Sequence, residues 1–128
     1  MPSYEFERFE APASMALVTF LNPVTGQSCA DVPMLLDTGA DISMIPVSAT
    51  REVNAQAVTD RTYEIAGYDD RTSIVPLVQL RMEWMGYKFN GEFMLIEQEY
   101  GIIGRNILNL LRVLFDGPRL NWETQRRA

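Results

Sequence analysis

The residues best suited to chemistry are Asp37-Thr38-Gly39, which follow the apolar run Met34–Leu36 and precede a second apolar run. Gly39 permits a tight turn behind the acid, so the carboxylate is expected at the mouth of a loop, where it could exchange protons with a substrate. The same tripeptide is also an ordinary turn at the end of a strand. A general acid–base role for Asp37 is therefore a hypothesis that needs support from other residues.

The residue inventory narrows the possible chemistry. The sequence of 128 residues contains no histidine and one cysteine, Cys29. This excludes a Ser-His-Asp or Cys-His triad, an intramolecular disulfide and a conventional zinc site within the chain. Acid–base work must fall to carboxylates, and we expect Cys29 to be a small core residue rather than a reactive thiol. No metal or cofactor is expected.

A second motif lies downstream, where residues 100–108 read Tyr-Gly-Ile-Ile-Gly-Arg-Asn-Ile-Leu, an apolar pair closed by glycine and followed by a helix-like run. With it, the chain resembles the retropepsins, the retroviral-type aspartic proteases. Their hallmarks are a hydrophobic-hydrophobic-Asp-Thr-Gly-Ala-Asp loop and a later Ile-Ile-Gly-Arg-Asn-Leu-Leu segment. Both are present almost letter for letter, with a flap-like segment between them, and the resemblance covers about Ala16 to Trp122.

The resemblance implies an all-β fold, a closed barrel-like domain with one short C-terminal helix and a flap hairpin. It also implies an aspartic endopeptidase with Asp37, Thr38 and Gly39 as catalytic residues. Thr38 would hydrogen-bond across a dimer axis, and Gly39 would let the substrate backbone approach closely. Because the other Asp residues lack a Thr-Gly turn with apolar flanks, the second carboxylate must come from the partner subunit of a homodimer.

The resemblance also implies roles for residues around this loop. Arg105 would pair with Asp41 within one subunit and tie the catalytic loop to the helix, since an acid and a guanidinium under a loop are better paired than alone. The alternative is two separate surface charges. The candidates for contact with a peptide or protein substrate are Ala40, Asp41, Ile42, Ile65, Ala66, Gly67 and Tyr68. Any one of the apolar candidates could instead be a core or surface strand residue.

These motifs need elements that position them. We expect an N-terminal arm over residues 1–14, a protease domain over 15–124 and a tail over 125–128. Alternating apolar residues bounded by turn signals predict strands over Met15–Leu21, Ser28–Leu36, Ile42–Ile45, Thr62–Ile65, Thr72–Leu80, Leu80–Trp84, Lys88–Ile96, Val113–Phe115 and Leu120–Trp122. We also expect one helical turn at Val47–Glu52, a loop over 54–60 and a short helix over Gly104–Leu111.

Composition and charge limit the classes of partner that this protein is expected to have. An apolar content of 47% in 128 residues suits one domain with a single core. The 11 basic residues are scattered, and with 17 acidic residues they give a net charge of −6, which argues against nucleic acid as a partner. No stretch approaches the roughly 18 apolar residues of a membrane span. With a single thiol and no signal pattern at the N-terminus, we expect a cytoplasmic protein.

The C-terminal segment is the predicted site of dimer contacts. Leu114, Phe115, Leu120 and Trp122 give a short hairpin more large apolar surface than one small subunit is expected to cover. We therefore expect this hairpin to pair with its symmetry mate and to carry most of the interface. The N-terminal arm is expected to contribute little.

Two other interpretations of the Asp-Thr-Gly turn remain open from the sequence. It could belong to a phosphoryl-acceptor or nucleotide-binding loop, but such enzymes need Mg²⁺ ligands, a phosphate-binding lysine and usually an α/β chain. Alternatively, the same fold could be a non-catalytic dimeric peptide-binding module that uses its groove without cleavage. The presence of Asp37 argues against the second interpretation, because two like charges brought together destabilise a groove that has no use for them.

Overall fold

The computed structural model describes residues 3–55, 57–66 and 72–125, with the backbone alone for 57–66 and 72–76. In chain order the elements are β1 (Tyr4–Glu5), β2 (Ala13–Leu21), β3 (Ser28–Leu36), β4 (Met44–Pro46), α1 (Val47–Glu52), β5 (Ala57–Ala66), β6 (Thr72–Trp84), β7 (Tyr87–Ile96), β8 (Gly101–Ile103), α2 (Arg105–Leu108), β9 (Arg112–Asp116) and β10 (Asn121–Gln125). The described chain is thus mostly β, as predicted, and both of its helices are short.

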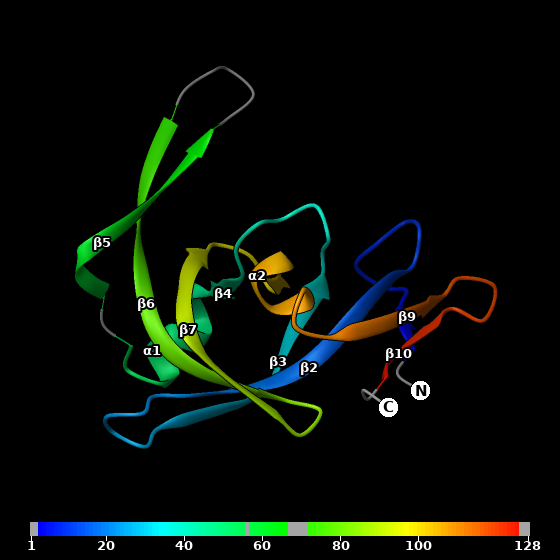
Figure 1. The fold of residues 1–128 in the computed structure, drawn as a ribbon, viewed down its shortest axis with the longest axis horizontal. Helices are drawn as coiled ribbons and strands as arrows, with labels where there is room; N and C mark the ends of the chain where they lie inside the picture. The colour runs from blue at the N-terminus through cyan, green and yellow to red at the C-terminus, as the bar shows by residue number, and fades with distance from the viewer. Residues whose placement is uncertain (1–2, 56, 67–71, 126–128) are drawn as a thin grey trace.

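Six of the strands close into a barrel. Their order is β2-β3-β8-β4-β7-β6, and β6 returns to β2 through pairs such as Phe20 with Met82. Most neighbours are antiparallel, whereas β3 with β8 and β4 with β7 are parallel. Figure 1 shows the barrel at the centre and the β5–β6 hairpin rising beyond it. The barrel confirms the predicted all-β class.

Alternation along the strands fills the barrel with apolar side chains. Phe20, Met34, Ile45 and Phe93 are almost completely buried, and the rings of Phe20 and Phe93 meet edge to face with centroids 5.3 Å apart. Full burial of one such side chain stabilises the fold by roughly 1.5–3 kcal/mol. This packing holds the parallel strand pairs in register, and those pairs support the loop that carries Asp37.

Several predicted boundaries differ from the structure. The loop predicted over 54–60 contains the start of β5, because Ala57 pairs with Val78 of β6 and keeps the chain extended. The strands predicted over 72–80 and 80–84 form a single 13-residue strand, β6, since no turn residue interrupts them. The short strand expected from Ile42 begins two residues later, as β4.

The short C-terminal helix expected from the sequence is present as α2. The helical turn predicted at Val47–Glu52 is present as α1, so the residues that the structure describes form two short helices. The second, α2, ends at Leu108 rather than Leu111. Beyond it, the backbone N–H of Leu110 bonds the carbonyl of Ile107 at 2.9 Å, a three-residue spacing that tightens and ends the helix. Leu111 then packs against the core at the start of the next segment.

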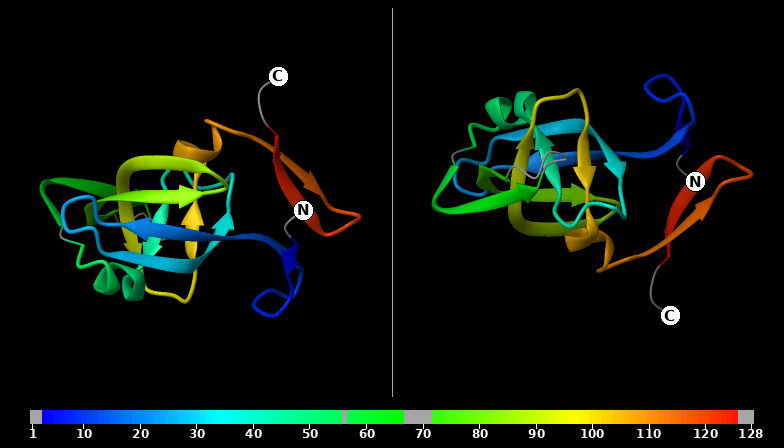
Figure 2. Two further views of the ribbon diagram at one scale, coloured as in Figure 1. Left: turned by 90° about the horizontal axis from the view of Figure 1, so that it is seen from below. Right: turned by 90° about the horizontal axis from the view of Figure 1, so that it is seen from above.

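The β9–β10 hairpin forms a separate two-stranded sheet that projects from the end of the barrel opposite α1 (Figures 1 and 2). Trp122 fixes it in place: its Nε1 donates to the carbonyl of Met15 at 3.0 Å, and its ring lies 5.5 Å from that of Trp84. With 1% of its surface exposed, Trp122 is buried inside its own subunit. The prediction that Trp122 belongs to a dimer interface is therefore wrong, whereas Leu114 and Phe115 remain 42% and 40% exposed.

The N-terminal arm packs against both the barrel and this hairpin. Strand β1 pairs with the start of β2, and the backbone N–H of Tyr4 donates to the carbonyl of Leu120 at 2.8 Å. Further along, the rings of Phe9 and Tyr100 meet with centroids 5.2 Å apart. Strand β2 begins at Ala13, and the domain boundaries expected at residues 14 and 124 stay predictions.

Candidate active site

Asp37 is the first residue after β3, and the backbone on both sides holds it in a defined turn. Its N–H donates to the carbonyl of Ile103 at 3.0 Å, and its carbonyl accepts from the N–H of Ala40 at 3.3 Å. The carboxylate oxygen Oδ1 accepts from the N–H of Gly39 at 2.8 Å. Asp37 is half-buried, while Thr38 and Gly39 are exposed. The turn therefore orients a carboxylate that stays accessible to a ligand.

Two neighbouring parallel strands bring the two sequence motifs together. Met34 pairs with Gly101 and Leu36 pairs with Ile103, so β3 and β8 end side by side. The glycine is required there, because a Cβ on Gly101 would collide with the Met34 sulfur and with a backbone carbonyl of β4. The loop after β3 consequently meets the start of α2, as the motif pair predicts.

Arg105 clamps this loop from the first position of α2. Its N–H donates to the carbonyl of Ala40 at 2.8 Å, and its guanidinium Nη1 donates to the carbonyl of Thr38 at 2.7 Å. Arg105 thus supports the loop through backbone carbonyls on either side of Gly39. The expected ion pair between Arg105 and Asp41 stays a prediction.

Ser43 and Asn106 complete the clamp, and sequence reasoning missed their role. The hydroxyl of Ser43 accepts from the N–H of Gly104 at 2.9 Å and donates to Oδ1 of Asn106 at 2.8 Å. Ser43 is 0% exposed, and its own carbonyl accepts from the N–H of Met94 at 3.1 Å. A serine inside an otherwise apolar strand pattern was the available signal, because a buried hydroxyl needs hydrogen-bond partners.

The predicted substrate contacts lie in two separate segments of the structure. Ala40 and Ile42 are half-buried in the loop that carries Asp37, and Asp41 between them is exposed. Ile65 and Ala66 end strand β5, on the side of the barrel where this loop lies (Figure 1). The two remaining candidates lie outside the described residues: Gly67 and Tyr68.

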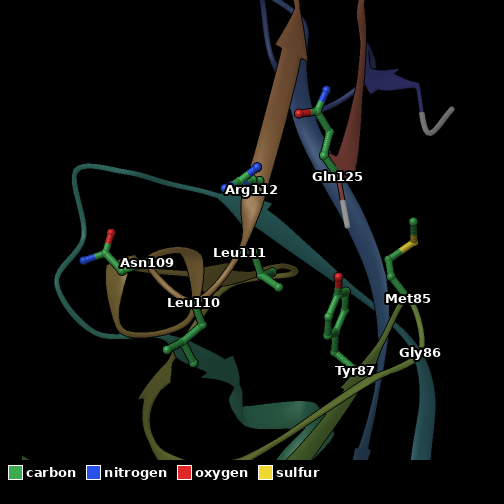
Figure 3. A pocket seen from close by; sticks show the side chains of 8 residues that line it. All are labelled: Met85, Gly86, Tyr87, Asn109, Leu110, Leu111, Arg112 and Gln125. Carbon is green, nitrogen blue, oxygen red and sulfur yellow. The ribbon is translucent and has the colours of Figure 1, made fainter. Parts of the chain in front are cut away.

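A separate groove of about 840 Å³ lies beneath the β9–β10 hairpin. Figure 3 shows Arg112 and Gln125 of the hairpin on one side, with Met85 and Tyr87 of the β6–β7 turn opposite them. None of the lining residues belongs to the loop after β3. No sequence pattern predicts this groove, because three segments that are distant in the chain form it.

The described residues show neither a metal site nor a membrane-spanning helix. No group of three or more potential metal ligands gathers within them. Likewise, α1 and α2 are both far too short to span a membrane.

Comparison with protein families gives one decisive match. A family described as retroviral aspartyl protease matches residues 22–115, which is more than half of the chain. The chain belongs to the retroviral aspartyl protease family. The matched range contains both motifs of this family, the Asp-Thr-Gly loop and the glycine-arginine-asparagine segment that clamps it. No curated protein matches the chain.

Solved structures of this family share the fold. The EIAV protease, solved in complex with the inhibitor HBY-793, matches with a TM-score of 0.56 and 19% identity, over 84% of this chain and 91% of that chain. The foamy viral protease-reverse transcriptase, solved with an RNA/DNA hybrid, matches with a TM-score of 0.54 and 17% identity. That match covers 91% of this chain and 13% of the viral chain. At these identities the likeness establishes the retropepsin fold.

Proposed function

We propose that this family member is an aspartic endopeptidase that hydrolyses peptide bonds through a water molecule activated by two Asp37 carboxylates, one from each subunit of a homodimer. The position of Asp37 is the main support. It follows β3 directly, it is accessible, and its Asp-Thr-Gly turn is clamped from β8 and α2. Membership of an aspartyl protease family supports the same chemistry.

The chemistry requires two carboxylates at close range. Two such groups cannot both be ionised, so they share one proton. The ionised group then takes a proton from water while the protonated group gives one to the carbonyl oxygen of the peptide. A two-fold axis is the simplest operation that brings two copies of Asp37 together. Dimerisation is therefore part of the proposed site.

The clamp supports this role by fixing the loop before substrate arrives. Hydrogen bonds to the carbonyls of Thr38 and Ala40 hold the turn from the α2 side, and a fixed site does not have to reorganise during the reaction. We propose that the peptide lies between this loop and the β5–β6 hairpin, in contact with Ala40, Ile42 and the tip that begins at Ile65.

The single thiol, Cys29, supports a cytoplasmic location.

Asp37→Asn tests the proposal. The variant keeps the size of the side chain and should keep the fold by circular dichroism, but it should not cleave a peptide library at mildly acidic pH. Asp31→Asn is a matched control, because Asp31 is an exposed acid of the same strand region, and it should cleave like the wild type. Retained turnover in Asp37→Asn would refute the assignment. Wild-type protein that binds an aspartic protease transition-state mimic without cleaving any peptide would instead support the non-catalytic peptide-binding module.

A further inference from the structure

The groove beneath the β9–β10 hairpin takes no part in the proposed catalytic site. Its volume of about 840 Å³ is within the range typical of ligand-binding sites. The β6–β7 turn, which forms one wall, and the loop that carries Asp37 lie on opposite sides of the barrel (Figure 1). Half of the lining residues have large apolar or aromatic side chains. A surface of this size and composition commonly marks a binding site.

The β6–β7 turn holds Met85 in a conformation that methionine rarely adopts. Trp84 pairs with Tyr87, so Met85 and Gly86 form a two-residue turn, with φ angles of 53° and 79°. Such turns favour Asn-Gly, because a long side chain is strained at positive φ. Met85 is nevertheless 48% exposed, and its side chain extends toward the hairpin (Figure 3). Local strain that presents an apolar side chain at a groove is typical of functional sites.

The other lining residues suit a peptide. Leu110, just beyond α2, is 62% exposed, and half-buried Tyr87 and Leu111 lie in the same groove. Methionine and leucine side chains can adapt to different apolar partners. Asn109 and Gln125 add amide groups, which can bond to both the carbonyl and the N–H groups of an extended chain. The groove therefore offers apolar contacts and backbone hydrogen bonds together.

The charge of the groove favours an acidic partner. Arg112 is the only charged residue that lines it. Its cross-strand neighbour is the neutral Gln125, and within the described part of the chain no carboxylate pairs with its guanidinium. In the sequence, two more arginines follow Gln125 directly, although the whole chain has a net charge of −6. A guanidinium beside apolar surface is well suited to bind a carboxylate through two hydrogen bonds.

We propose that this groove binds a peptide segment in which an acidic side chain lies beside large apolar ones. The carboxylate contacts Arg112, and the apolar side chains pack against Met85 and Leu110. In a protein substrate, this segment lies apart from the bond that is cut and holds the substrate on the enzyme. This role in substrate capture rests on the proposed function. The binding itself does not, so the two can fail separately.

Peptide selection tests the binding. Asp37→Asn protein, which should cut nothing, is used to select from a random decapeptide library, and we expect the selected peptides to combine Glu or Asp with Leu, Ile or Phe. Their affinity, measured with labelled synthetic peptides, should fall by about tenfold or more in Arg112→Gln and in Leu110→Asn. The controls Arg119→Gln and Val24→Asn change exposed residues outside the groove and should keep it. Failure to select such peptides, or affinity that survives both groove substitutions, would overturn the proposal.

Met85→Asn separates binding from folding. Asparagine suits a positive φ, so Tm at equal subunit concentration should rise by about 2–5 °C, whereas affinity for the selected peptides should fall by about fivefold or more. A residue with a purely structural role would not give both changes. Unchanged affinity in this variant would show that the strained turn serves no ligand. Peptide that is displaced as the dimer fraction rises in sedimentation would assign the groove to the subunit interface, which would also overturn the proposal.

A tethered substrate tests the role in capture. Joining a selected peptide through a flexible linker to a peptide that the wild type cleaves should lower KM by about tenfold and leave kcat unchanged. Arg112→Gln should abolish this advantage. An unchanged KM would refute substrate capture. Wild-type protein that binds the selected peptides but cleaves no peptide would instead refute the proposed function and leave the groove as a peptide-binding site.

Discussion

Ser43→Ala tests how strongly one buried hydroxyl holds the loop that carries Asp37. In the wild type this hydroxyl accepts from the N–H of Gly104 at 2.9 Å and donates to Asn106 at 2.8 Å. Its loss leaves the buried N–H of Gly104 without a partner, at a cost of about 1–3 kcal/mol. Asn106 is exposed, so water can satisfy its oxygen, and this second lost bond costs about 0.5–1 kcal/mol. We expect the free energy of unfolding to fall by about 1.5–4 kcal/mol in total.

Thermal denaturation at equal subunit concentration measures this loss, since dimerisation would make Tm depend on concentration. For a domain of this size the expected decrease in Tm is roughly 5–20 °C. Hydrogen exchange should also become faster at the amide of Gly104. Ser48→Ala removes an exposed serine from α1 and should change stability by no more than about 0.5 kcal/mol. If Ser43→Ala behaved like this control and Gly104 stayed protected, the hydroxyl would not be the support we describe.

In Gly104→Ala, the added Cβ would lie 2.7 Å from the carbonyl oxygen of Ile42 and 2.9 Å from that of Ala40. This overlap should lower the free energy of unfolding by about 1–3 kcal/mol and should also lower kcat/KM. An unchanged urea midpoint would contradict this. Burial, together with the Glu52 carboxylate, raises the pKa of the Cys29 thiol to about 11. Cys29 should therefore react with iodoacetamide more slowly than a free thiol at neutral pH, and Glu52→Gln should speed the reaction. Between pH 9 and about 11 the folded chain keeps the Cys29 proton that the unfolded chain releases, so the free energy of unfolding should fall as pH rises from 9 towards 11. A pH titration of the urea midpoint measures this, and a midpoint that rises over the same range would contradict it.

Short-range patterns were sufficient to predict the loop that carries Asp37. An apolar strand, a tight turn and a glycine are neighbours in sequence, so their types identify the strand end and the carboxylate together. Such patterns could not predict the hydrogen bonds of Ser43, because its partners lie on a segment about sixty residues away in the sequence. Strand β8 was missed for a related reason: with three residues it is too short to show alternation.

Trp122 illustrates a different limit of sequence reasoning. A large apolar residue near a chain terminus predicts that some surface covers it, but not which surface does so. Here the barrel of the same subunit covers the ring, and the carbonyl of Met15 accepts its N–H. The exposed residues of the hairpin, Leu114 and Phe115, could be separated from Trp122 only once the cross-strand register was known.

The pairing of β3 with β8 also sets the order in which this molecule can fold. The N–H of Asp37 has its acceptor on Ile103, so the loop cannot close until that distant residue has been synthesised. Contacts of such long sequence separation form slowly, since the intervening chain must first be ordered. The β2–β3 and β6–β7 hairpins join residues close in sequence and can form earlier. A chain still emerging from the ribosome therefore carries Asp37 on a loop without this support until Ile103 has left the ribosome and β8 has paired with β3.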